Sequence, residues 1–241
     1  MRYRIIEDPK RAAKRPNVVM KIRLFTAIFD FEMARREIPA FRGAIIKKVG
    51  RESILFHNHS GNKFRYAYPL IQYKLVGKNP AIICINSGYD ESLKLFENTE
   101  WNFNINNKVV HVGIKHLSFD YFECALTSSV VKYKINNWFE LNEQNFKKYT
   151  LLTADSERKE FLEKIKILIG NILSFAKGIN WIINDQIMVS VDYIPNRRFF
   201  NFKNNKIAGF DLIFSTNVLL PDKIGLGKSV SRGFGIIRKV A

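Results

Sequence analysis

Cysteine is scarce in this sequence, in which Cys84 and Cys124 are the only two. Both lie in apolar, strand-like runs, and this placement favours buried thiols of a cytoplasmic protein over a disulfide. Two cysteines and four scattered histidines are also too few for a zinc site with the usual Cys and His spacing. The sequence therefore predicts no disulfide, no metal and no other cofactor.

Long apolar runs are missing as well. No stretch reaches the roughly 18 apolar residues that a helix needs to span a bilayer. The N-terminus carries basic residues without the apolar segment of a signal peptide. We therefore expect a cytoplasmic protein with no membrane-spanning segment.

Acidic residues are few relative to basic ones. The chain has 22 Asp and Glu against 39 Lys and Arg, which gives a formal net charge of +17. A folded protein with such a surplus repels itself, so the surplus usually serves a polyanionic partner. Nucleic acid is the first candidate and an anionic membrane the second. The apolar share of 46% is ordinary for a globular protein and excludes disorder as the main state.

The first half of the chain predicts alternating strands and helices. Residues 1–17 are polar and basic and are expected to form an arm. Pro39 precedes a predicted helix and Gly50 ends it, as is usual at helix termini. The expected order of elements is close to the βαββαβ plan of a ferredoxin-like domain. It runs through strand Val18–Phe31, helix Ala40–Val49, strands Ser53–Phe56, Phe64–Leu75 and Pro80–Asn86, helix Tyr89–Glu97, and strands Trp101–Asn104 and Lys108–Lys115.

The second half predicts another α+β unit. Its clearest helix runs from Ser156 to Lys177, where apolar residues recur alternately four and three apart and so share one face. Strands are expected at Phe119–Tyr133 and Gln186–Ile194, with a hairpin formed by Arg197–Lys203 and Ala208–Ser215. The predicted division is an arm over 1–17, an N-terminal domain over 18–116 and a C-terminal domain over 117–241.

Two of the four histidines, His57 and His59, are separated by a single residue beside a turn. If residues 56–59 are extended, the two side chains point the same way. Imidazoles transfer protons near neutral pH, as RNA cleavage by a 2′-OH requires. One imidazole would take the 2′-OH proton and another would protonate the leaving 5′-oxygen, while a Lys or Arg offsets charge on the phosphorane. The alternative interpretation is a pair of ordinary surface histidines; His111 and His116 are expected to be structural.

Four glycines fall within residues 225–235 near the C-terminus. Gly227-Lys228-Ser229 resembles the end of a phosphate-binding P-loop, but Asp222 stands where that motif requires its first glycine, so ATP binding is not expected. What remains is a loop whose exposed backbone N–H groups, with Lys228 and Arg232, could hold the phosphates of a larger polymer. A plain glycine-rich hairpin loop is the alternative interpretation.

These segments together resemble a known family. The loop is similar to the G-rich loop of the RAMP superfamily, and its Ser231-Arg232-Gly233-Phe234-Gly235 core fits the CRISPR repeat-processing endoribonucleases, the Cas-six group. The resemblance is to the b branch of that group and covers roughly residues 18–241, in patches. The segments that carry it in the first half are Phe41-Arg42-Gly43-Ala44-Ile45, Leu55-Phe56-His57-Asn58-His59, Tyr66-Ala67-Tyr68-Pro69-Leu70-Ile71-Gln72-Tyr73-Lys74 and Pro80-Ala81-Ile82-Ile83.

The resemblance implies an α+β fold of two tandem ferredoxin-like (RRM-like) domains with a C-terminal glycine-rich loop. It also implies metal-independent cleavage within CRISPR repeat RNA that leaves a 5′-hydroxyl and a cyclic phosphate. His59 is expected to transfer protons with His57 as its partner, and Tyr66 to orient the attacking hydroxyl or the phosphate. The expected RNA-binding residues are Arg42, Lys47, Lys48, Lys63, Arg65, Arg197, Arg198, Gly225, Gly227, Lys228, Ser229, Ser231, Arg232, Gly233 and Gly235.

Two other functions remain open on the sequence alone. The same superfamily supplies non-cleaving RNA-binding subunits of CRISPR effector complexes, and a basic DNA-binding protein would also carry a positive surplus. The histidine pair favours the enzyme. The expected partners are CRISPR repeat RNA, an effector complex and a second copy of the chain.

Overall fold

The computed structural model describes residues 19–50, 52–57, 59–60, 63–64, 67–97, 100–139, 156–202 and 205–240, with the backbone alone for 59–60, 63–64, 156–163, 193–202 and 205–208. The basic arm predicted over residues 1–17 lies outside this range. Contacts divide the described chain into two compact units. Of the described residues, the N-terminal unit holds those within 21–122 and 229–233, and the C-terminal unit holds 19–20 and those within 123–228 and 234–240. The domain boundary predicted after residue 116 stays a prediction; it falls within a long strand that has residues in both units.

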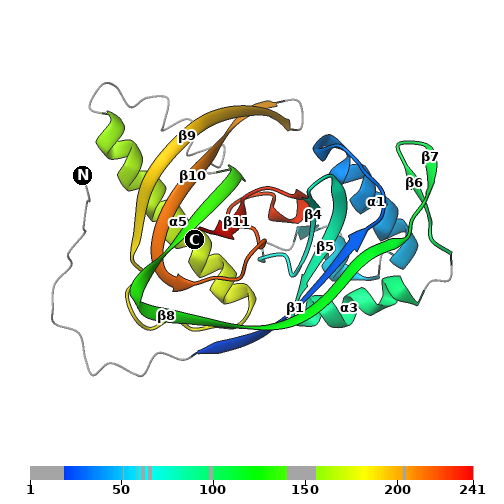
Figure 1. Ribbon diagram of the computed structural model, residues 1–241, viewed down its shortest axis with the longest axis horizontal. Coiled ribbons are helices and arrows are strands. Elements are labelled where there is room, and N and C mark those ends of the chain that lie inside the picture. The colour runs from blue at the N-terminus through cyan, green and yellow to red at the C-terminus, as the bar shows by residue number, and fades with distance from the viewer. Residues whose placement is uncertain are drawn as a thin grey trace. The chain divides into compact units, whose positions relative to one another are not determined.

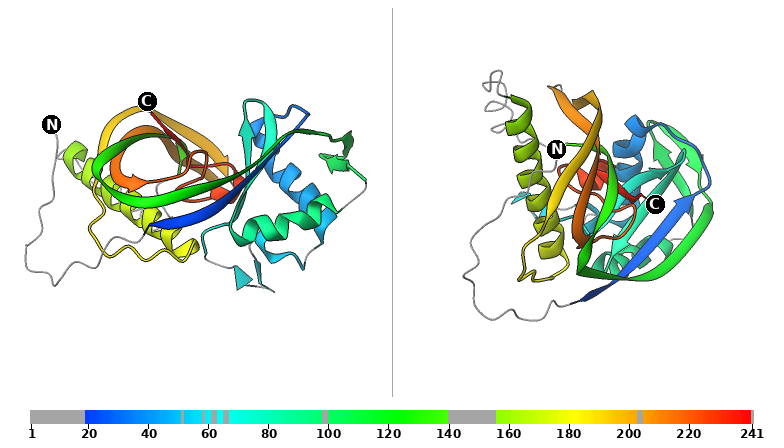
Figure 2. Two further views of the ribbon diagram at one scale, coloured as in Figure 1. Left: turned by 60° about the horizontal axis from the view of Figure 1, so that its bottom comes forward. Right: turned by 60° about the vertical axis from the view of Figure 1, so that its left-hand side comes forward.

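The sheet of the N-terminal unit has the strand order of a ferredoxin-like domain. Its order is β4-β5-β1-β8, and the β1–β5 and β4–β5 pairs are antiparallel. Helices α1 and α3 follow β1 and β5 and share one face of this sheet (Figures 1 and 2). The elements are β1 (Met20–Phe29), α1 (Ile38–Val49), β4 (Ile71–Val76), β5 (Asn79–Ile85), α3 (Ser87–Phe96) and β8 (Ile114–Trp138), with a short 3-10 helix η1 (Arg35–Glu37) before α1 and a hairpin of β6 (Asn102–Ile105) and β7 (Lys108–His111) before β8.

Aromatic side chains fill the core between this sheet and its helices. Phe25, Ala27 and Phe29 are buried at alternate positions of β1. The Phe41 ring of α1 packs edge-on against Phe29 at 5.4 Å between ring centroids, and against Tyr73 of β4 at 6.1 Å. Dense packing of this kind fixes the position of α1 and of the side chains on its other faces.

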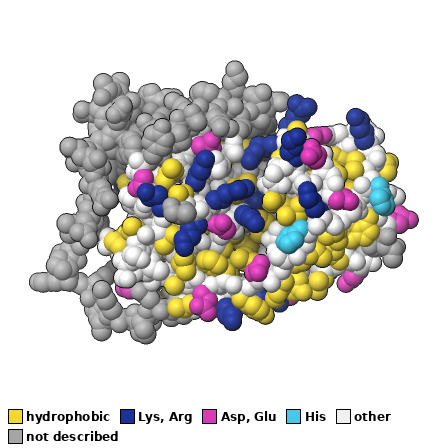
Figure 3. Space-filling view, in the orientation of Figure 1, with side chains coloured by type: hydrophobic (Ala, Val, Ile, Leu, Met, Phe, Trp, Pro, Cys, Tyr) yellow, Lys and Arg dark blue, Asp and Glu magenta, His cyan; other side chains and the backbone are white. Residues whose placement is uncertain are grey.

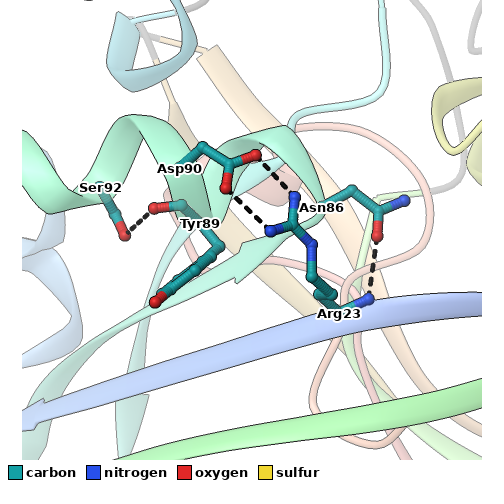
Figure 4. A network of polar contacts seen from close by, with 5 residues as sticks. All are labelled: Arg23, Asn86, Tyr89, Asp90 and Ser92. Carbon is teal, nitrogen blue, oxygen red and sulfur yellow. Dashed lines mark hydrogen bonds and ion pairs between the residues drawn. The ribbon is translucent and has the colours of Figure 1, made fainter.

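The start of α3 is fastened to β1 by polar contacts (Figure 4). Asn86 adopts a positive φ of 48° just before the helix; its side-chain oxygen accepts the Arg23 N–H at 2.9 Å. The Arg23 guanidinium donates to both carboxylate oxygens of Asp90, at 2.9 and 2.6 Å, in the first turn of α3. A carboxylate there also interacts favourably with the helix dipole. This pair is partly exposed, so it sets geometry more than stability.

Two predicted strands of this unit differ from the structure. The strand expected over Phe64–Leu75 is not continuous, because β3 (Lys63–Phe64) ends at Phe64 and β4 begins only at Ile71. Residues 53–56 were expected to form a strand, but the structure has one helical turn, α2 (Ile54–His57). The buried Ser53 hydroxyl donates to the Val49 carbonyl, and the Phe56 N–H donates to the Ser53 carbonyl at 3.1 Å. Because Phe56 is also buried in the core, a turn that closes against the end of α1 is preferred to an extended segment. The expectation that His57 lies in an extended segment with His59 is therefore overturned.

The C-terminal unit repeats the same strand order, and the long helix among its described residues is α5. Strands β8, β9, β10 and β11 pair antiparallel in the order β11-β8-β10-β9, and α5 packs against β9 (Figures 1 and 2). A glycine-rich stretch with a short 3-10 helix stands where a second helix would connect β10 to β11. The elements of this unit are α5 (Ser156–Gly178), β9 (Val189–Phe202), β10 (Asn205–Leu219) and β11 (Ile236–Lys239), whereas η2 (Val230–Arg232) belongs to the N-terminal unit. The predicted α+β class with two ferredoxin-like domains is confirmed.

The apolar face predicted for the long helix is confirmed where the side chains are described. Ile165, Leu168, Ile172 and Phe175 of α5 are all buried.

Cys84 and Cys124 are buried and unpaired, as predicted. Burial raises the pKa of each thiol to about 12, so both are protonated at neutral pH. Among the described helices, none combines the length and apolar composition needed to cross a membrane.

Candidate functional site

His57 is the last residue of α2, and His59 opens the next strand. β2 (His59–Ser60) pairs antiparallel with β3 (Lys63–Phe64), so that His59 lies opposite Phe64. The His57 side chain is half-buried, whereas those of His59 and Lys63 lie outside the described part. Tyr66 and Arg65 also lie outside it. The backbone therefore places the two histidines at the junction between a helical turn and a small hairpin.

Arg42 of α1 holds the end of α2. Its Nη2 donates to the His57 carbonyl oxygen at 2.7 Å, which satisfies one of the carbonyl groups left free at a helix C-terminus. The guanidinium carbon lies 5.9 Å from the centroid of the buried Tyr73 ring. The Arg42 Nε is buried and has no hydrogen-bond partner within the described residues. A buried donor without a partner is costly, so a bound acceptor at this position would stabilise the site.

The segment Ser229–Gly233 of the glycine-rich stretch packs on the N-terminal unit. Gly233 has a φ of +80°, and a Cβ there would lie 2.7 Å from Ile38 Cδ1 and 3.2 Å from the Tyr73 carbonyl oxygen. Only glycine fits both this conformation and this close approach. Nη1 of Arg35 donates to the Gly233 carbonyl at 2.7 Å. These contacts bring Arg232, distant in sequence, to the same unit as Arg42 and His57.

Positive charges accumulate around this segment. Burial lowers the pKa of the Arg42 guanidinium from its usual value, and the charge of Arg232 lowers it further. Burial likewise lowers the pKa of Lys74 in β4 well below its usual value, with Arg35 adding to the effect. The charges of Arg42 and Arg232 therefore repel each other within the N-terminal unit. An anion bound between them would offset this repulsion.

The glycine-rich stretch does not present its amides as predicted. The N–H of Leu226 donates to Gly235 O at 2.8 Å, that of Lys228 to Phe139 O at 3.4 Å, and that of Gly235 to Asn137 O at 3.0 Å. In the C-terminal unit Gly227 is needed for close packing, because a Cβ there would lie 2.7 Å from Trp138 Nε1. The expectation of a loop of exposed backbone N–H groups is therefore wrong for these residues and for Arg232 and Gly233, whose N–H groups bond to Ser229 O and Val230 O. The glycines serve packing, and the side chains of Lys228, Ser229, Ser231 and Arg232 remain the candidates for phosphate contacts.

The remaining predicted residues lie on other faces or other elements. Successive helical residues are rotated by about 100°, so Lys47 and Lys48 lie about 140° and 120° around α1 from Arg42, on opposite sides. Lys48 Nζ instead lies 5.7 Å from the centroid of Phe103 in the β6–β7 hairpin. Arg197 and Arg198 of β9 pair with Phe210 and Gly209 in the C-terminal unit, and their side chains lie outside the described part. Gly225 forms an isolated bridge with Ile236 in that unit.

Sequence reasoning did not assign Arg35, Tyr73 or Lys74 to the site. A lysine within the apolar run Ile71–Val76 was the one available signal, because a charged residue is rarely buried in a strand without a reason. Across the residues that the structure describes, no group of three His, Cys, Asp or Glu side chains is arranged to hold a metal ion.

Two ferredoxin-like strand orders in tandem, with a glycine-rich stretch whose 3-10 turn packs on α1 and β4, define a RAMP-type protein. The family models then identify the branch: a Cas6b N-terminal domain model matches residues 20–123, and a Cas6b C-terminal domain model matches residues 125–240. The chain belongs to the Cas6b family.

Related proteins agree with this assignment. A crystal structure of a Cas6b is 29% identical, with a TM-score of 0.81 over 92% of this chain and 100% of its own. The crystal structure of a CRISPR RNA processing endoribonuclease Cas6b is 27% identical, with a TM-score of 0.67 over the same shares. An uncharacterized protein of Methanocaldococcus jannaschii is 32% identical over 142 residues, which are 57% of this chain and 91% of that protein.

Proposed function

We propose that this protein is a metal-independent endoribonuclease that cuts precursor CRISPR RNA within its repeats to give mature guide RNAs. Membership of the Cas6b family and similarity to a solved CRISPR RNA processing endoribonuclease support this function. Proposed partners beyond the repeat RNA are an effector complex and a second copy of the chain. The cytoplasm is the proposed location.

One observation in the structure carries the proposal. Arg42 fixes the backbone of His57, has a buried Nε with no hydrogen-bond partner among the described residues, and is repelled by Arg232. A phosphate group between the two guanidinium groups would satisfy the free donor and offset both charges, and arginine is well suited to phosphate. A phosphate held there would lie close to the end of α2, where the histidine pair begins.

The reaction needs no group beyond those of the protein and the RNA. One imidazole of the pair removes the proton of the 2′-OH, and the 2′-oxygen attacks the adjacent phosphorus. The bond from phosphorus to the 5′-oxygen breaks while the other imidazole, in its protonated form, donates a proton to that oxygen. The products are a cyclic phosphate and a 5′-hydroxyl. In this proposal His59 is the principal proton-transfer residue, His57 its partner, and Tyr66 orients the hydroxyl or the phosphate.

The remaining basic residues are proposed to bind the RNA backbone away from the reacting phosphate. Neutralising each phosphate releases counterions, so these contacts add affinity that falls with salt. The residues proposed for this role are Lys47, Lys48, Lys63, Arg65, Arg197, Arg198, Lys228, Ser229 and Ser231.

The proposal predicts that repeat RNA is cut in excess EDTA. Because the two proton transfers are assigned to imidazoles, removal of divalent metal ions should leave the cleavage rate within about twofold of its value without EDTA. The products should carry a cyclic phosphate and a 5′-hydroxyl, which end-labelling and mass spectrometry distinguish. Tight binding without cleavage would favour the alternative, a non-cleaving RNA-binding subunit. Cleavage that requires a divalent metal ion would contradict the mechanism.

Replacing Arg42 tests the observation on which the site rests. Arg42→Ala should lower the rate of RNA cleavage at subsaturating protein by about 10- to 100-fold, because charge-assisted hydrogen bonds contribute about 1.5–3 kcal/mol. The cleavage rate of Arg42→Lys should lie between those of the wild type and Arg42→Ala. Lysine keeps the charge but lacks the forked guanidinium that can donate to the His57 carbonyl and to a phosphate at the same time. Single-turnover cleavage measures both.

Arg36→Ala is the matched control, because Arg36 is exposed on η1 and its loss changes the net charge by the same amount. Thermal unfolding of each variant shows whether the fold is kept. If Arg42→Ala cleaves as fast as Arg36→Ala while remaining folded, Arg42 has no part in the site.

A further inference from the structure

A cluster of basic side chains lies on the C-terminal unit, at residues that received no role above. Lys132 and Lys134 of β8 and Arg238 of β11 are all exposed. Figure 3 shows Lys and Arg side chains gathered over β11 and the neighbouring part of β8. We call Lys132, Lys134 and Arg238 the strand patch.

The three cations share one face of the sheet. Between them on β8, Tyr133 is buried, as is Ile237 beside Arg238 on β11, so these neighbours occupy the opposite, core-facing side. The register places Arg238 directly opposite Lys134 in the antiparallel pair. Like charges at directly opposed positions destabilise strand pairing, so this arrangement costs stability in the free protein.

The strand patch has no internal partner in the described part of the chain. None of the three side chains forms an ion pair or hydrogen bond there. The carboxylates on adjoining segments are engaged elsewhere. Asp192 on β9 accepts from the hydroxyls of Ser190 and Ser215, and Asp222 accepts from the Lys239 N–H. The positive charge of the strand patch is therefore available to a partner.

The geometry and composition of the strand patch favour a phosphate backbone. Residues two apart on a strand are separated by about 6.8 Å, comparable to the rise of about two nucleotides along one nucleic-acid strand. The same face of β8 and β11 offers no aromatic side chain between Lys132 and Asn136 or between Ile236 and Val240, and so no ring on which a base could stack. Contacts of Lys and Arg with phosphate oxygens carry no sequence information.

We propose that the strand patch is an additional binding site for the phosphate backbone of RNA, which raises affinity without reading base sequence. This inference rests on the proposed function, because it takes RNA as the polyanion. It predicts that the strand patch acts in binding only. The site of cleavage and the rate at saturating protein should not depend on it.

The test compares two triple variants with the same change in net charge. The patch variant carries Lys132→Gln, Lys134→Gln and Arg238→Gln, and the control variant replaces the exposed Lys78, Lys108 and Lys177 with Gln. Binding of repeat RNA is measured from 50 to 300 mM salt, together with binding of an RNA of the same length and scrambled sequence. The patch variant should bind both RNAs about 10- to 100-fold more weakly at about 0.15 M salt, and its plot of log Kd against log salt should be shallower by about 2.

The control variant should stay within about threefold of the wild-type Kd. Equal weakening of both variants would reduce the effect to net charge and overturn the proposal. The proposal is also overturned if the patch variant keeps the wild-type salt dependence of RNA binding. It is overturned as well if this variant loses binding to vesicles of anionic lipid while its RNA binding is unchanged. If the wild-type protein neither binds nor cuts repeat RNA, the proposed function itself fails, an outcome distinct from a failure of the strand patch.

Discussion

His59→Ala is expected to lower the rate constant of RNA cleavage by about 10²- to 10⁴-fold while leaving RNA affinity unchanged. A positioned general acid or base accelerates a reaction by about this factor. Removing the imidazole leaves the phosphate contacts in place. His57→Ala should also reduce the rate. The contact of Arg42 with this residue is made through the backbone carbonyl, so the His57 substitution removes the imidazole without removing that anchor. The double variant should lose less than the product of the two single effects, because an acid and a base that serve one step act as a unit.

The other two histidines provide matched controls. The His111 ring contacts Asn102 Oδ1 at 3.0 Å in the β6–β7 hairpin, and His116 is exposed on β8. His111→Ala and His116→Ala should cleave at the wild-type rate. The measurement is single-turnover cleavage with protein in excess, alongside a direct binding assay. If His57→Ala and His59→Ala both cut at the normal rate, the proposed assignment of the histidine pair is wrong.

Local signals in the sequence predicted most of the regular elements. Pro39 and Gly50 marked α1, and the recurrence of apolar residues along α5 predicted the face that the structure buries. Strand order could be inferred only by analogy with the βαββαβ plan, because register and pairing depend on residues far apart in the chain. The order β4-β5-β1-β8 confirms that analogy for the N-terminal unit.

The short segment before the histidines shows where local signals fail. Leu55 and Phe56 fit a strand and a helical turn equally well, since a short apolar run has no decisive period. The packing of Phe56 in the core and the hydrogen bond of Ser53 to the end of α1 decide between them. Neither contact can be predicted from the sequence of residues 53–56 alone.

The arrangement of basic residues also lay beyond sequence reasoning. Arg42 and Arg232 were both predicted to bind RNA, but only the packing of Gly233 against Ile38 and Tyr73 shows that they belong to one unit. The same loop was expected to work through its amides, which are largely used within the chain. The surplus of 17 positive charges indicated a polyanion. We propose that part of that surplus, on Arg42 and Arg232, binds the reacting phosphate, and that another part serves the strand patch.

The central claim is that the 2′-OH of the RNA is the attacking group. The most direct measurement is single-turnover cleavage, in excess EDTA, of a repeat RNA with one 2′-deoxy nucleotide immediately upstream of the cut. We predict that this substitution abolishes cleavage while the Kd stays within about twofold, because it removes the nucleophile and no phosphate contact. An RNA with the 2′-deoxy nucleotide two positions further upstream should be cut normally. Cleavage of the first RNA at the normal rate would contradict the account, since a different nucleophile would then be at work.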